Sequence, residues 1–129
     1  MELNRTIHIN NDSLVRDIQS EFSSWYPFLK IEFHAKKINL KSSRMPSLEP
    51  HFQLKQLAEI LPGEIDINGH RTVEEVSNDI QGMLPVIVQM SRKSGNVWNT
   101  ISISHGWTLQ SQNTAGEFIS SEMTIPIKP

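Results

Sequence analysis

The stretch Gly63–Ile103, GEIDINGHRTVEEVSNDIQGMLPVIVQMSRKSGNVWNTISI, decides the fold. Its clearest signal is a capping box, in which the side chains of Thr72 and Glu75 accept hydrogen bonds from each other's backbone amides at the start of a helix. Apolar residues then recur at helical spacing and predict one buried stripe, formed by Val73, Val76, Ile80, Met83 and Leu84. Gly82 is the expected C-terminal stop of this helix.

Strands are predicted on both sides of the helix. Residues 64–67 form the first, before a turn at Asn68-Gly69. The strand over 86–90 begins without polar alternation, which indicates a central strand covered on both faces. The turn Ser94-Gly95-Asn96 supplies the positive backbone angle that a hairpin needs, and a third strand is expected over 97–103.

A weaker unit of the same kind lies upstream. Thr6–Ile9 is predicted as a strand, and Asp12 or Ser13 as the cap of a helix that ends before Pro27. The apolar face of that helix comprises Leu14, Val15, Ile18, Phe22 and Trp25. Apolar and polar residues then alternate over 29–33, which predicts a strand with one buried face.

The two units align when the sequence is shifted by 58 residues. The shift matches Ile7 with Ile65, Ile9 with Ile67, Asn10 with Asn68, Val15 with Val73 and Pro27 with Pro85. We interpret this as an internal repeat that arose by duplication, the alternative being two similar supersecondary units. Either origin predicts an α+β fold, a two-layer sandwich of two β-α-β units with the helices on one face of a mixed sheet. Ferredoxin-like and β-grasp-like topologies both fit.

A single domain is predicted over residues 1–129. Its parts are the first β-α-β unit at 6–34, a loop and short helix at 35–62, the second unit with its hairpin strand at 63–103, and a C-terminal helix and edge segment at 104–129. Within them, Ile38–Leu40 is a candidate edge strand and 52–61 a candidate short helix. A further helix is expected over 108–113, and a last edge strand over 122–127.

Composition limits the classes of function. The chain of 129 residues carries 12 lysines and arginines against 14 acidic residues, a formal net charge of −2, which disfavours nucleic acid or an anionic membrane as the main partner. It has no cysteine, so disulfides and thiolate chemistry are absent. The N-terminus has no secretory signal pattern, and no apolar run is long enough to span a bilayer. We therefore expect no membrane partner and a cytoplasmic location.

No motif commits the chain to a chemistry. The five histidines show no ligand spacing such as HExxH, although neighbouring strands could bring His8 and His34 together. The acidic residues are explained by helix caps and solvated faces. No serine lies in a GxSxG motif, and the glycines form no phosphate-binding loop. We expect no catalytic residue, no cofactor and no metal.

Four residues mark a candidate interaction surface: Trp98, Trp107, Arg92 and Lys93. Trp98 falls on the polar side of its predicted strand, opposite Val97 and Ile101. If Val97 and Ile101 face the helices, Trp98 lies on the open face of the sheet and can anchor a partner or a second copy. The alternative is that the C-terminal segment covers it with Trp107 or Phe118.

The basic residues near Trp98 suggest a nucleic-acid interface as well. Arg92 and Lys93 would act with the run formed by Lys36, Lys37, Lys41 and Arg44. The aromatic-rich strand signature of RNA-binding sheets is missing. The plainer interpretation is that Arg92 and Lys93 keep a hairpin tip soluble.

Three segments carry a resemblance to a known family: Tyr26–Phe33, Arg92–Trp98 and Trp107–Asn113. The motif RKSGNVW followed by WTLxxQN resembles a family of small uncharacterised bacterial proteins, in which similar motifs occur in the same order. The resemblance covers Thr6 to about Gly116. It implies a compact bacterial cytosolic α+β domain, brings no established function and carries over no catalytic residue.

The sequence therefore leaves three hypotheses for function. The first is a non-catalytic protein-interaction or self-association module, which binds an unknown protein partner or forms a homo-oligomer. The second is a small-molecule-binding protein or small enzyme with a pocket near the 35–62 excursion. Nucleic-acid binding is the third.

Overall fold

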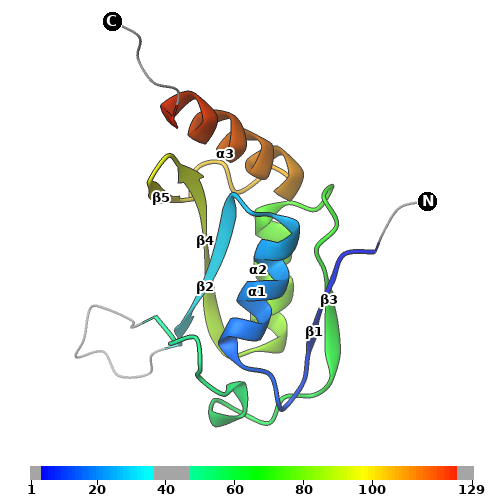
Figure 1. Ribbon diagram of the computed structural model, residues 1–129. Helices are drawn as coiled ribbons and strands as arrows, with labels where there is room; N and C mark the ends of the chain where they lie inside the picture. Colours follow the sequence, from blue (N-terminus) through cyan, green and yellow to red (C-terminus); the bar gives the residue numbers. More distant parts are fainter. Residues whose placement is uncertain (1–3, 37–46, 125–129) are drawn as a thin grey trace, which may run out of the picture.

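The computed structural model describes residues 4–36 and 47–124 (Figure 1). In chain order its elements are β1 (Thr6–Ile9), α1 (Val15–Trp25), β2 (Leu29–Ala35), the 3-10 turn η1 (Leu54–Gln56), β3 (Gly63–Asp66), α2 (Val73–Met83), β4 (Val86–Ser94), β5 (Val97–Thr100) and α3 (Leu109–Thr124). The predicted α+β class, with helices packed on sheets, is confirmed. The candidate strand Ile38–Leu40 lies outside the described residues.

The described strands form two antiparallel sheets in place of the single mixed sheet that was predicted. β1 pairs with β3 in one sheet, and β2, β4 and β5 form the other in that order. Each β-α-β unit starts in the two-stranded sheet and ends in the three-stranded sheet, so the two strands of a unit do not pair with each other. A ferredoxin-like or β-grasp-like topology requires these strands in one sheet, and the described strands depart from both.

The core lies between the helix pair and the two sheets. α1 packs on β1 and β2, and α2 packs on β3 and β4, so the helices lie between the sheets in Figure 1. The alternating strand residues Leu29, Ile31 and Phe33 are buried, as their pattern predicted. They meet the apolar face of α1, at Ile18 and Phe22, in one cluster.

Three local predictions are confirmed. The Glu75 amide donates to Thr72 Oγ1 at 3.0 Å and the Thr72 amide donates to Glu75 Oε1 at 2.9 Å, which completes the capping box. β4 is the central strand of its sheet. Gly95, with φ 67°, occupies the first loop position of the β4–β5 hairpin, where a two-residue turn needs a positive φ.

The ends of the two predicted helices differ from expectation. The N-cap of α1 is Leu14, where Asp12 or Ser13 was predicted. The Ser13 hydroxyl instead accepts a hydrogen bond from the Asn10 amide. The Asp17 carboxylate accepts a hydrogen bond from the Leu14 amide at 2.8 Å. Gly82 does not stop α2, which runs to Met83 and ends as the chain becomes extended.

The segments after each unit also differ. In place of the short helix predicted over 52–61, the structure has the 3-10 turn η1, whose first residue, Leu54, is buried in the core. The helix predicted over 108–113 continues to Thr124 as α3. The predicted last edge strand is therefore wrong over Glu122–Thr124, and the rest of it lies outside the described residues. β5 ends at Thr100 and is shorter than predicted.

Candidate functional site

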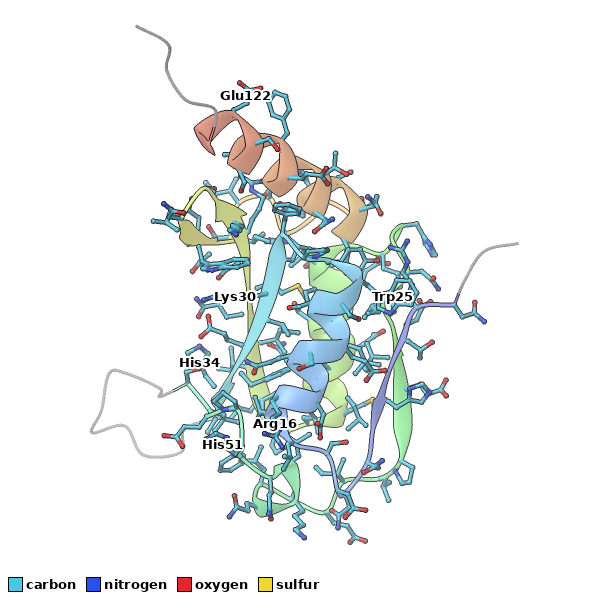
Figure 2. The ribbon with its side chains drawn as sticks, in the orientation of Figure 1. Arg16, Trp25, Lys30, His34, His51 and Glu122 are labelled. Atoms are coloured by element: carbon cyan, nitrogen blue, oxygen red, sulfur yellow. The ribbon has the colours of Figure 1, made fainter. Side chains whose placement is uncertain are left out.

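The outer face of the three-stranded sheet carries Trp98. Leu29, Ile31 and Phe33 in β2 are buried on the side that faces α1. Because side chains alternate along a strand, Lys30 points to the opposite face. Trp98 lies across from Lys93 in the β4–β5 register and is 38% exposed. The Lys30 Nζ lies 5.2 Å from the centroid of the Trp98 ring, within the range of a cation–π contact. Figure 2 shows Lys30 and His34 along β2 on the side away from α1.

Exposed large apolar side chains concentrate in the last third of the described chain. We name this set the C-terminal apolar set; it comprises Val97, Trp98, Ile103, Trp107 and Phe118. Leu61 is the other exposed large apolar residue among those described. Trp107 is 51% exposed and Phe118 is 65% exposed, so neither is buried against Trp98.

Two of these exposures have a direct structural cause. The open-face position of Trp98 was predicted on the condition that Val97 and Ile101 face the helices. Val97 is exposed, because β5 pairs with Ser91–Ser94 at the end of β4. Phe118 is exposed because α3 turns a different face toward the sheet. The residues on that buried face are Leu109, Gln112, Asn113, Gly116 and Ser120.

α3 is attached by polar contacts more than by apolar ones. Asn113 Oδ1 accepts from the Phe28 amide at 2.8 Å, and the Ser120 hydroxyl accepts from the Gly95 amide at 3.1 Å. Gly116 permits the close approach, since a Cβ there would lie 2.9 Å from the Phe28 Cβ and 3.1 Å from the Arg92 Cγ. This buried face has few large apolar residues, so its periodicity was not visible in the sequence.

Arg92 and Lys93 point to opposite faces of β4. Consecutive strand residues alternate, so Lys93 shares the outer face with Trp98 while Arg92 turns toward α3. Arg92 Nη1 donates to Gln112 Oε1 at 3.0 Å. Of the other basic residues in the suggested nucleic-acid interface, Lys36 is exposed, and those at 37, 41 and 44 lie outside the described residues.

Two of the histidines, His8 and His105, lie beside carboxylates. His8 Nδ1 lies 3.5 Å from Glu21 and its Nε2 lies 3.3 Å from Glu64, while His105 Nδ1 lies 3.3 Å from Glu74. His8 and His34 belong to strands of different sheets. Over residues 4–36 and 47–124, no group of three or more histidine, aspartate or glutamate side chains could hold a metal ion.

Among the described side chains, two have clearly shifted pKa values. Burial raises the pKa of the Tyr26 phenol above 10.0, and its hydroxyl donates to the Ile67 carbonyl at 2.5 Å. Hydrogen bonds from Thr72 lower the pKa of Glu75 below 4.5. Both groups hold the fold, because one joins the end of α1 to the chain after β3 and the other caps α2.

Two hollows border the β4–β5 region. A groove of about 400 Å³ runs between α2 and β4 and includes Glu74, Ser77, Ile101 and His105 in its lining. A smaller pocket of about 180 Å³ is lined by Arg92 and residues 99–104. No described residue of 35–62 lines either hollow, so neither corresponds to the pocket predicted near that excursion.

Comparison with known proteins gives no relative from which a role can be transferred. No family model, no curated protein and no solved structure matches the chain. In the described part of the chain, no helix is long and apolar enough to cross a membrane. The function is therefore argued from the residues themselves.

Proposed function

We propose that this protein is a non-catalytic protein-interaction or self-association module that binds through the C-terminal apolar set. The observation that carries the proposal is the position of the exposed large apolar residues. Of the six such residues in the described part of the chain, five lie within 97–118, at β5, α3 and the segment between them, and outside the two β-α-β units that form most of the core. We propose that these residues contribute to one binding surface, since exposed large apolar side chains that form a patch are typical of binding sites.

Trp98 is the expected anchor of this surface. Tryptophan is enriched among the residues that contribute most to binding, because a rigid indole covers a large apolar area at little cost in conformational entropy. Lys30 lies near one side of the ring and Lys93 is its cross-strand neighbour. The lysines favour a partner surface that places acidic groups around the indole.

Light scattering after size exclusion tests self-association. Wild type is compared with Trp98→Ala and with Leu61→Ala, which removes an exposed apolar side chain far along the chain from the set. We expect wild type and Leu61→Ala to form dimers, and Trp98→Ala to be a folded monomer by circular dichroism. A dimer that persists in Trp98→Ala would place the interface elsewhere.

A monomeric wild type would contradict self-association and leave a heterologous partner. That case is tested with a photo-crosslinking amino acid at position 107 and, as the matched control, at position 61. A discrete adduct formed in cells only from position 107 supports the proposal. The same products from both positions, or none, contradict it.

The groove between α2 and β4 supports the second candidate, a small-molecule-binding protein or small enzyme. Its volume of about 400 Å³ lies in the range of ligand sites, and it combines apolar residues with the Glu74–His105 pair. Nucleic-acid binding is the third candidate, and the opposite directions of Arg92 and Lys93 do not support it. We also propose a cytoplasmic location, because a chain without cysteine fits a reducing compartment.

A further inference from the structure

Arg92 carries a partly buried charge without a described counter-charge. It lies where the end of β4 meets β5 and α3 (Figure 1). Among the described residues, no carboxylate lies within 4.0 Å of its guanidinium, and its Nε is buried without a hydrogen-bond partner. Its described acceptor is the neutral amide oxygen of Gln112. A buried charge is normally paired, because desolvation without compensation is costly.

The pocket beside Arg92 is lined by groups that suit an anion. Its volume is about 180 Å³, and its polar lining residues other than Arg92 are Asn99, Thr100, Ser102 and Ser104. The remaining lining residues are Ile101 and Ile103, so no carboxylate is among the described residues that line this pocket. Arg92 therefore supplies the only formal charge in that described lining.

The hydrogen bonds around Gln112 fix the direction of one hydroxyl. Arg92 can only donate, so the Gln112 atom that it contacts is the amide oxygen. The amide nitrogen then donates at 2.8 Å to both the carbonyl and the hydroxyl oxygen of Ser104. Because the Ser104 hydroxyl oxygen accepts there, its own hydrogen is left to donate to another group.

Thr100 also lines the pocket, but it lies opposite Ser91 in the β4–β5 register, on the face of the sheet that Arg92 does not share. Its hydroxyl oxygen accepts from the Gln89 amide nitrogen at 2.8 Å on that face. One hydroxyl donor, from Ser104, and one guanidinium thus come from the residues that line this small pocket. Guanidinium and hydroxyl donors together are suited to the oxygens of a phosphate, a sulfate or a carboxylate.

We propose that this pocket binds a small oxyanion, with Arg92 supplying the charge and Ser104 donating a hydrogen bond. This inference goes beyond the proposed interaction function and does not depend on it, because the expected anchor of that surface, Trp98, lies on the other face of the sheet. Ile103 is the member of the C-terminal apolar set that also lines the pocket. The oxyanion is either a free ion of phosphate size or a carboxylate. The two sources share the same recognition chemistry and are separated by the test.

The test is NMR titration of the full chain with sodium phosphate, sodium sulfate and sodium acetate, each at constant ionic strength set with sodium chloride. We expect saturable amide shifts within 99–104 and at Arg92, in the millimolar range that suits so small a ligand. Saturation with phosphate or sulfate assigns a tetrahedral oxyanion, and saturation with acetate alone assigns a carboxylate. Shifts that grow linearly with every salt overturn the proposal.

Variants separate the pocket from general surface charge. Arg92→Gln removes the cation and should weaken binding by about tenfold or more, and Ser104→Ala should weaken it by a few fold. Lys93→Gln is the matched control, since it removes the neighbouring positive charge on the opposite face and should leave the affinity unchanged. If Arg92→Gln fails to fold, Ser104→Ala still decides. Unchanged affinity in Ser104→Ala, or a loss in Lys93→Gln equal to that in Arg92→Gln or Ser104→Ala, overturns the proposal.

Discussion

Ile7 lies directly opposite Ile65 in the β1–β3 ladder, and these are the two residues that a shift of 58 places brings together. In the β2–β4 ladder, Glu32 lies opposite Gln89, 57 places further along the chain. A local twofold axis passes through each pair of directly opposite residues in an antiparallel ladder. Both sheets therefore place equivalent parts of the two β-α-β units opposite each other. This is the arrangement that a fused pair of copies would adopt, and a duplication origin stays a prediction.

Tyr26 should titrate at unusually high pH. The chain has one tyrosine, so absorbance of the phenolate reports this residue alone. Burial raises its pKa, so the folded state holds the phenol proton more tightly than the unfolded state does. The stability it contributes is complete below pH 10.0 and is lost as pH rises through the folded-state pKa. The measurement is absorbance titration in buffer and in urea.

Tyr26→Phe provides the control for that titration. The variant leaves the Ile67 carbonyl without its donor and should lower the free energy of unfolding by about 1–3 kcal/mol. The variant should also lack the decrease in the free energy of unfolding that the ionisation of Tyr26 causes at high pH. A folded-state titration at the same pH as in urea would contradict the burial of this phenol.

Glu75 should make the stability of α2 depend on pH in the acid range. Its pKa is lowered by the Thr72 hydrogen bonds, so the folded state binds fewer protons than the unfolded state. The contribution is complete above pH 4.5 and is lost as pH falls through the folded-state value. As the pH is lowered from 6 to 3, the Tm of wild type should approach the Tm of Glu75→Gln, and thermal unfolding measures both.

Two glycines within helices should respond to alanine with opposite signs. At Gly116 a new Cβ meets the Phe28 Cβ at 2.9 Å and the Phe28 carbonyl oxygen at 3.2 Å, so Gly116→Ala should lower the free energy of unfolding by about 1–3 kcal/mol. At Gly82 nothing lies within 4 Å, so Gly82→Ala should raise it by about 0.5–1 kcal/mol. Urea unfolding measures both. Equal stabilisation by the two substitutions would mean that α3 does not dock closely on Phe28.

Gly95 should be sensitive to substitution for a backbone reason. Its φ of 67° is unfavourable for residues with a Cβ, so Gly95→Ala should lower the free energy of unfolding by about 1–2 kcal/mol. Gly106→Ala is the matched control, because that loop glycine is exposed and a Cβ added there would meet nothing within 4 Å. A cost at Gly106 as large as that at Gly95 would remove the turn geometry as the cause.

The two β-α-β units were predictable because each helix and strand has an apolar period of its own. The stripe through Val73 and Ile80 and the alternation of 29–33 specify which side of each element is buried. Such patterns do not specify which strands pair. A helix that crosses from one sheet to another therefore leaves the same signal as one that returns to the same sheet.

The candidate sites were harder to predict, because they depend on α3. Its buried residues Gln112, Asn113, Gly116 and Ser120 are polar or small, so no apolar stripe extends past Asn113. Their three- and four-residue spacing was the one available signal. The direction of Arg92 follows from strand alternation, but its acceptor Gln112 comes from this helix.

The docking of α3 has a consequence for stoichiometry. The two β-α-β units present matched surfaces to each other within one chain, and among the described residues α3 has no counterpart in the first unit. A binding surface built on β5 and α3 therefore breaks the internal symmetry and occurs once per chain. We therefore expect a valency of one for a partner that binds at the proposed surface.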